Sequence, residues 1–158
     1  MTGSIVALGN VDPGELTRID PIVEDGRRVA GVDCIRNQVW RHEAELSDPR
    51  LAGTMTTSWN WDDFGVAASV GPSWGTIAIE NDGGAWTGTF TGVELPDGTM
   101  DTHAWLGGSG AYAGLTAFLC LQCHGHGPAL PYDRDATHAW GATGVIYRGA
   151  PPALAFAG

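Results

Sequence analysis

Glycine constrains the fold of this chain more than any other residue, because 24 of its 158 residues are glycine and they are spread along the whole sequence. A glycine in a helix interior costs about 1 kcal/mol relative to alanine, whereas strands and tight turns use glycine for bulges, bends and positive φ angles. The seven tryptophans also suit strands. The sequence therefore predicts strands joined by tight turns.

Short segments rich in Val, Ile, Thr, Trp and Phe alternate with turn sequences from residue 27 onward. Typical turns are Asn81–Gly84 and Pro96–Gly98, where Pro sets φ and Gly or Asn accepts positive φ. This spacing predicts an all-β fold, a single eight-stranded antiparallel β-barrel. The expected strands are Arg28–Ile35, Gln38–Leu46, Leu51–Trp61, Trp74–Asn81, Ala85–Leu95, Thr99–Gly107, Leu115–His124 and Thr137–Tyr147.

The length of the chain fits one domain with one core. We expect the barrel to span residues 27–148. Residues 1–26, which include Pro13 and Pro21, are expected to form a mobile cap, an extra strand or an arm over the barrel mouth. Residues 149–158 form a C-terminal tail, in which Pro151 and Pro152 argue against a strand.

The charge of the chain excludes several functions. Eighteen acidic residues against eight basic ones give a net charge of −10, which repels nucleic acid and anionic membranes. All eight basic residues are arginine, so there is no lysine for a Schiff base, a pyridoxal phosphate site or a P-loop. No apolar run is long enough to span a membrane and no signal peptide is apparent, which predicts a cytoplasmic protein with three free thiols.

Three short motifs match known site patterns in the wrong context. Gly71–Gly75 fits the nucleophile elbow but is followed by a predicted strand, and Gly108–Ala113 fits a dinucleotide fingerprint but lies between hairpins. Cys120–His124 fits the haem attachment pattern, but on a strand the two cysteines point to opposite faces, so they cannot both bind one metal ion. We therefore expect no metal and no cofactor.

Four segments carry a resemblance to a known superfamily: Ser47–Gly53, Trp74–Thr76, Asn81–Gly88 and Gly107–Leu115. The chain resembles the calycin-like barrels of the allene oxide cyclase-like superfamily. That superfamily includes plant dirigent proteins and the bacterial cyclases that close spirotetronate rings by [4+2] cycloaddition. These segments are turn and packing motifs, so the resemblance implies the fold more strongly than the chemistry.

A barrel of this kind would place its site in the lumen. Asp101, His103 and Trp105 share one strand face, and the family match places Trp74 and His103 inside. We expect His103 and Glu80 to act as catalytic acid or base, because both side chains can transfer protons. The expected substrate-binding residues are Trp74, Thr76, Thr89, Thr91, Trp105, Leu119, Leu121 and Cys123.

These residues predict a cofactor-free cyclase or isomerase that folds an apolar, polyketide-like or lipid-like substrate inside a dry lumen. Two alternatives stay open: a non-catalytic binder of a hydrophobic metabolite, and a structural barrel that works through a protein partner. A further possibility is an inert barrel whose narrow interior is filled by its own side chains. Trp86 and Phe90, expected on the outer face, predict a homodimer.

Overall fold

The computed structural model describes every residue except 26, 66–68, 125–138 and 153–158. The chain is all-β, as the sequence predicts. Two 3-10 turns, η1 (Pro49–Leu51) and η2 (Gly110–Tyr112), are the helical segments of the described residues, and none is long and apolar enough to cross a membrane. The strands are β1 (Thr2–Asp12), β2 (Glu15–Glu24), β3 (Arg27–Leu46), β4 (Gly53–Asp63), β5 (Gly71–Asn81), β6 (Gly84–Glu94), β7 (Thr99–Gly108), β8 (Leu115–His124) and β9 (Ala139–Arg148).

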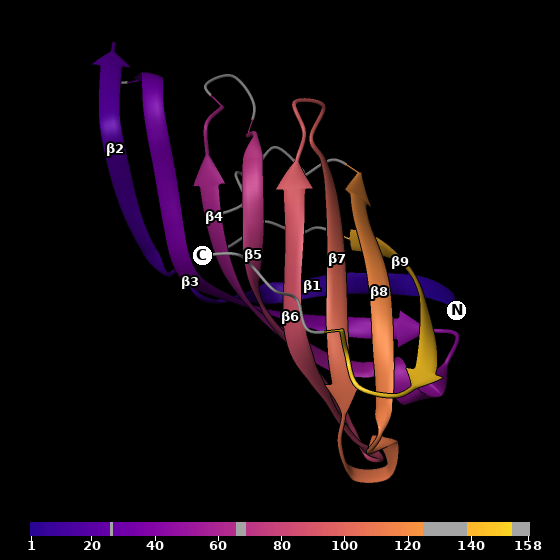
Figure 1. Cartoon of the computed structure of the whole chain (residues 1–158). Coiled ribbons are helices and arrows are strands. Elements are labelled where there is room, and N and C mark those ends of the chain that lie inside the picture. The colour runs from indigo at the N-terminus through magenta and orange to yellow at the C-terminus, as the bar shows by residue number, and fades with distance from the viewer. Residues whose placement is uncertain (26, 66–68, 125–138, 153–158) are drawn as a thin grey trace.

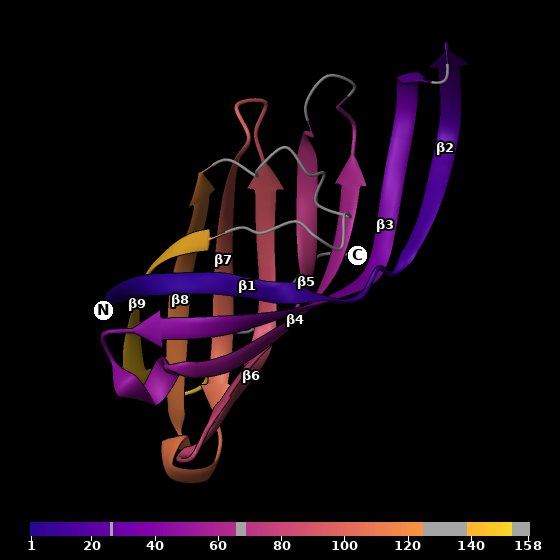
Figure 2. The ribbon, with the colours of Figure 1, turned by 180° about the vertical axis from the view of Figure 1, so that it is seen from behind.

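All nine strands belong to one antiparallel sheet in the order β1-β9-β8-β7-β6-β5-β4-β3-β2. β1 also pairs with β3, so the sheet closes into a ring, and β2 pairs with β3 alone among the described strands. Figures 1 and 2 show β1 and the second half of β3 crossing the side of the ring opposite β5–β8, while β2 and the first half of β3 extend away from it.

The nine strands differ in detail from the eight predicted segments. The first two predicted strands form the single 20-residue strand β3, in which the expected turn at Arg36-Asn37 is a bulge where Asn37 has a φ of 57°. Residues before 27 form β1 and β2, which favours the extra-strand alternative over a cap or an arm. β1 is therefore part of the ring, because it pairs with β9 on one side and with residues 39–46 of β3 on the other.

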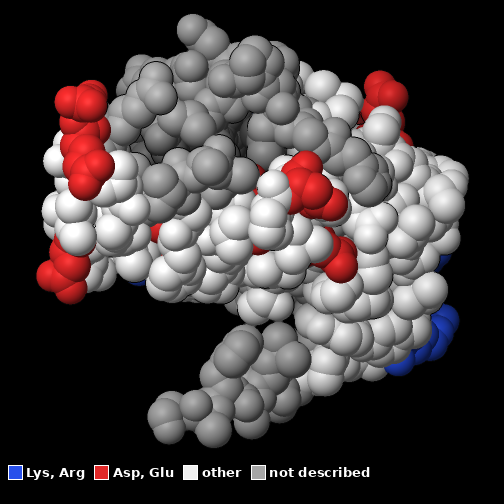
Figure 3. All heavy atoms as spheres, turned by 90° about the horizontal axis from the view of Figure 1, so that it is seen from above, with Lys and Arg blue, Asp and Glu red and all other residues white. Residues whose placement is uncertain are grey.

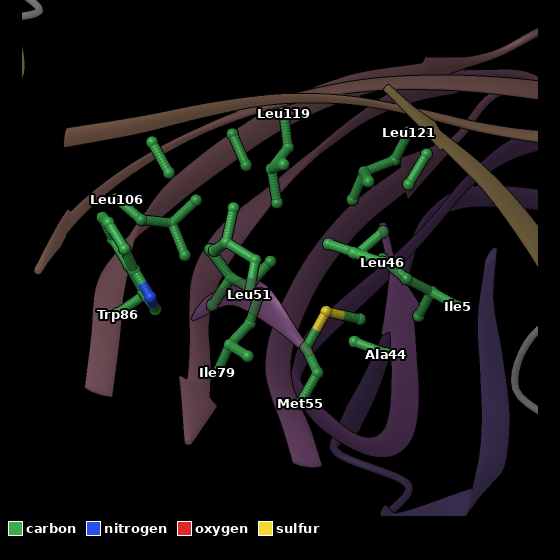
Figure 4. Close-up of a cluster of buried hydrophobic side chains, with 14 of the residues drawn as sticks. Ile5, Ala44, Leu46, Leu51, Met55, Ile79, Trp86, Leu106, Leu119 and Leu121 are labelled. Carbon is green, nitrogen blue, oxygen red and sulfur yellow. The ribbon is translucent and has the colours of Figure 1, made fainter. Parts of the chain in front are cut away.

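Burial alternates along the strands and defines an inner and an outer face. Large apolar side chains from all sides of the ring point toward one another in its interior (Figure 4). This alternation is the expected signature of a sheet with one face on a core. The end of the ring where β5 and β7 end and β6 begins is the lower end in Figure 1, and the inner residues nearest to it in the sequence include Leu51, Met55, Ile79, Trp86 and Leu106, all buried.

Hydrogen bonds close the lower end of the ring. Leu51 of η1 is fully buried, and the Trp86 indole N–H donates to the Arg50 carbonyl at 2.7 Å. The Tyr112 ring stacks on Trp86 at 5.1 Å, and its hydroxyl donates to Asn81 Oδ1 at 2.7 Å. Asn81 Nδ2 in turn donates to the Ala52 carbonyl at 2.8 Å. We call this group of Leu51, Asn81, Trp86 and Tyr112 the plug. Three of the four segments on which the superfamily resemblance rests meet in it.

The prediction of which residues face inward was wrong on three strands and correct on one. On β8, Leu119, Leu121 and Cys123 are buried, as expected. On β5, β6 and β7 the assignment was shifted by one residue, and a shift of one exchanges the two faces of a strand. The inner residues of these strands include Trp86 and Phe90, which were expected outside. The outer ones are Trp74, Thr76, Glu80, Thr89, Thr91, His103 and Trp105.

Candidate functional site

Aromatic rings from three separate strands meet inside the upper half of the ring. The Trp59 ring of β4 lies 4.3 Å from the Phe90 ring of β6 and 5.7 Å from the Trp140 ring of β9. Trp40 of β3 is buried in a second apolar cluster that also contacts Trp59. The Trp59–Phe90 contact lies over Gly75 of β5, whereas the Trp59–Trp140 contact joins strands that lie apart in the ring. The upper interior is therefore lined largely by aromatic surface.

A row of polar side chains crosses four adjacent strands at this level. Trp61 pairs with Ser73, Ser73 with Gly92, and Gly92 with Thr102, from β4 to β7. Trp61 Nε1, Ser73 Oγ and Thr102 Oγ1 are buried and have no hydrogen-bond partner among the described residues. A buried donor left without a partner costs about 1–3 kcal/mol. The row is thus costly for folding unless something else occupies it.

Gly92 opens the space that two of these hydroxyls face. A Cβ atom at Gly92 would lie 2.5 Å from Thr102 Oγ1 and 2.9 Å from Ser73 Oγ. Both distances are too short for a real side chain, so only glycine leaves the two hydroxyls room. The two hydroxyls therefore lie together over Gly92, a position called the notch below, with the Trp61 indole N–H on the neighbouring strand.

Glu94 and Cys123 lie above the notch on β6 and β8. Both are buried, and each is adjacent to Met100 of β7 in the strand register. Burial, together with the nearby Glu94 carboxylate, raises the pKa of the Cys123 thiol to about 11. Cys123 is therefore a neutral thiol at physiological pH, and its side chain acts as apolar lining rather than as a nucleophile.

Two further carboxylates are buried near the upper end, and both have structural partners. Asp33 forms an ion pair with Arg18 of β2 at 3.3 Å. Asp63 Oδ1 accepts hydrogen bonds from the backbone N–H groups of Gly65 at 2.8 Å and Val70 at 3.1 Å. Seen from above in Figure 3, acidic side chains stand at several places on this end of the molecule, and basic side chains show only at its margins. The upper end is therefore acidic.

The two predicted catalytic residues lie on the outer face and far from each other. The His103 side chain is exposed, and its Nε2 lies 3.9 Å from Asp101 Oδ1. On β6, Thr91 pairs with His103 and Ala85 with Glu80. Six residues of strand separate these two positions, roughly 20 Å at 3.3 Å per residue. His103 and Glu80 therefore form no common site, and neither reaches the interior.

Three of the predicted binding residues do share a hollow, but their side chains belong to the outer face. The hollow has a volume of about 530 Å³ and lies over β5 and β6. It is lined by residues 72–75 of β5 and 89–92 of β6, of which Pro72, Thr89 and Thr91 are exposed and Trp74 is half-buried. The guanidinium of Arg36, which pairs with Asp62 at 2.6 Å, lies 5.0 Å from the centre of the Trp74 ring. Trp74 is thus held in place as part of the outer wall.

Sequence reasoning missed the inner polar row, although a signal for it was present. On β5, Ile77 and Ile79 alternate with Thr76 and Glu80, so the more apolar phase, which also contains Ser73, belongs inside. The resemblance to the barrel superfamily had pointed to the opposite phase. No local signal indicates that Ser73 and Thr102 converge, because that depends on strand pairing and on Gly92.

The two cysteines of the Cys120–His124 motif lie on opposite faces of β8. Cys123 is buried inside and Cys120 lies on the outer face, as predicted from strand alternation. Among the described residues no group of three or more His, Cys, Asp or Glu side chains is placed to hold a metal ion. His126 and His138 lie outside the described residues.

Comparison of the chain with protein-family models, with curated proteins and with solved structures finds no match. The class of protein is therefore defined here by the fold and by the residues of the interior. The chain is an antiparallel β-sheet closed into a ring, with an apolar lower end and an aromatic upper interior that contains hydrogen-bond donors without a partner in the described part of the chain.

Proposed function

We propose that this protein is an eight-stranded barrel, extended by β2, that holds an apolar small molecule in its upper interior and acts on it as a cofactor-free cyclase or isomerase. The observation that carries this proposal is the row of three buried donors, Trp61 Nε1, Ser73 Oγ and Thr102 Oγ1, that have no partner among the described residues. Such donors are costly to bury unless a ligand acceptor satisfies them.

A carbonyl oxygen is the acceptor that suits this row. The notch at Gly92 offers two hydroxyls to one small space, and the aromatic rings of Trp59, Phe90 and Trp140 supply the apolar surroundings. Hydrogen bonds to a carbonyl oxygen in a dry cavity withdraw electron density from a conjugated alkene. This lowers the barrier to ring closure or double-bond migration. The aromatic walls would hold a flexible chain in a folded, reactive conformer.

Two other functions remain as alternatives. A non-catalytic carrier of a hydrophobic metabolite would use the same cavity and the same donors. A barrel that works only through a protein partner would not need unpartnered donors in its interior, so the polar row favours the two ligand-binding functions over this one.

The test of binding uses an acylnaphthalene fluorophore, whose ketone accepts hydrogen bonds, and an alkylnaphthalene of equal size that lacks the ketone. We expect the ketone to quench tryptophan emission at lower concentration than the alkyl probe. Thr102→Val preserves side-chain shape and removes one donor, which is worth roughly 1 kcal/mol, so ketone affinity should fall about fivefold or more. The affinity for the alkyl probe should not change.

Thr89→Val is the matched control, because Thr89 lies on the outer face. It should leave both affinities unchanged. Equal binding of the two probes, or equal effects of Thr102→Val and Thr89→Val, would show that the inner row does not recognise an acceptor.

Catalysis is separated from carriage by a model substrate that contains a conjugated diene and an enone in one flexible chain. Acceleration of its ring closure that is lost in the Ser73→Ala, Thr102→Val double variant would support a cyclase. Tight binding of the same compound with no acceleration would support the carrier.

A further inference from the structure

The outer face of strands β5–β9 differs in charge from the rest of the sheet. These strands contain four charged residues, Glu80, Glu94, Asp101 and Arg148, and Glu94 is buried inside. Strands β1–β4, of the same total length, contain fourteen. For a chain with a net charge of −10, a wall this poor in charge is unusual. Depletion of charge together with aromatic enrichment is typical of the core of a protein interface.

Aromatic side chains form a ridge along the middle of this wall. The Trp105 ring of β7 lies 4.3 Å from the Phe118 ring of β8 and 6.5 Å from the Tyr147 ring of β9. The His103 ring lies 5.8 Å from Phe118. Val145, which pairs with Phe118, is 56% exposed. The aromatic ridge of His103, Trp105, Phe118, Val145 and Tyr147 thus stands on the outside of the ring, apart from the inner site.

A hollow lies on either side of the aromatic ridge. The first, over β5 and β6, has a volume of about 530 Å³ and includes Trp74 and Thr91 in its lining. The second, over β8, β9 and β1, has a volume of about 370 Å³. Strand pairing places lining residues of both hollows and His103 in one continuous row across the sheet: Trp74, Thr91, His103, Cys120, Thr143 and Thr2.

We propose that this wall is the contact surface for a second copy of the same chain. A two-fold axis would place the aromatic ridge of each copy in a hollow of the other, which is the self-complementary arrangement that an isologous dimer requires. The distribution of charged residues also favours a second copy of the chain on this wall. Two copies that each carry a charge of −10 repel each other except where charged groups are sparse, and this wall is the part of the described sheet where they are sparsest.

This surface replaces the one expected from the sequence. Trp86 and Phe90, which were expected to form a dimer contact, are buried inside the ring. The exposed edge strand β2 is the competing surface, since Leu16, Ile19, Ile22 and Val23 are exposed there. However, a bulge with Pro21 interrupts β2, and bulges and prolines on edge strands hinder pairing with another strand.

The experiment measures the mass of the full chain by sedimentation equilibrium. The protein concentration runs from about 0.1 to about 50 μM, so that it brackets common dimer dissociation constants. We expect the wild type to have twice the 16.5 kDa mass of one chain. Val145→Glu should raise the dimer dissociation constant at least about 100-fold, because it places a charged group on the ridge that would be buried in a hollow of the other copy. Tyr147→Glu, at another exposed position, should act in the same way and guards against a folding defect in the first variant.

Ile22→Glu on β2 is the matched control, because Ile22 is 56% exposed, like Val145. It should leave the dissociation constant unchanged. A monomeric wild type would overturn the proposal. So would dissociation by Ile22→Glu, alone or together with Val145→Glu, or a dimer that resists both Val145→Glu and Tyr147→Glu. Circular dichroism confirms that each variant retains its strands before its mass is interpreted.

Discussion

The lower and upper halves of the interior are built from the same strands but satisfy their side chains differently. At the lower end, the polar side chains around Trp86 have partners: the Trp86 indole donates to a carbonyl and Asn81 bridges Tyr112 and the backbone. In the upper half, Ser73 and Thr102 have buried hydroxyls with no partner among the described residues. The lower half therefore stabilises the fold. In the upper half, the unsatisfied hydroxyls lower the stability of the fold, as residues of functional sites commonly do.

The largest expected effect is in the lower half. Trp86→Ala should lower the free energy of unfolding by about 3–5 kcal/mol, because it removes a fully buried ring, its hydrogen bond and its stacking on Tyr112. Urea unfolding followed by circular dichroism measures the change. Trp86→Phe, which keeps most of the ring, should cost much less. Equal losses from the two variants would mean that packing in the plug does not depend on the large ring.

The next effect concerns the buried thiol of the upper half. The pKa of Cys123 is raised from 9.0 to about 11, so the neutral thiol is the form that the folded state favours. Its contribution to stability is fully present below pH 9 and is lost as the pH rises through 11. The stability difference between wild type and Cys123→Ala should therefore shrink by about 2 kcal/mol between pH 8 and pH 11. A pH-independent difference, measured by urea unfolding, would contradict the burial of this thiol.

The smallest effect is the sharpest test of the comparison. Thr102 is 1% exposed and Thr57 is 2% exposed, but Thr57 Oγ1 accepts a hydrogen bond from the Trp59 indole at 2.7 Å and Thr102 Oγ1 has no described partner. Thr57→Val should therefore destabilise the protein by about 1–2 kcal/mol. Thr102→Val should leave stability unchanged or raise it by up to about 1 kcal/mol. Thermal unfolding of both variants compares them, and equal losses would show that Thr102 is satisfied in the folded protein.

The strands themselves could be predicted from the sequence because the alternation of apolar and polar residues and the turn residues are local. Segments such as Thr99–Gly107 and Leu115–His124 differ by one residue or none from β7 and β8. The inner face of β8 was also predicted correctly, since Leu119 and Leu121 alternate with polar positions. The faces of β5, β6 and β7 were predicted incorrectly because aromatic and threonine residues on these strands were assigned to a lumen by analogy, against the position of Ile77 and Ile79.

The candidate site could not be predicted in the same way. Ser73 and Thr102 lie 29 positions apart on strands separated by β6, and only the pairing of both strands with Gly92 brings their hydroxyls to one notch. β1 and β2 were left open because Pro13, Pro21 and several acidic residues weaken the local strand pattern before residue 27. Their place became defined only when β1 paired with β3 and β9.

The sequence by itself determined that the chain is β-rich, acidic, free of lysine and punctuated by turns, because these properties depend on composition and on neighbours along the chain. Tertiary structure decided which faces of β6 and β7 are inside, because one residue of register exchanges the two faces of a strand. It also decided that the ring closes through β1, that the lower end is sealed, and that three donors from distant segments share one buried row.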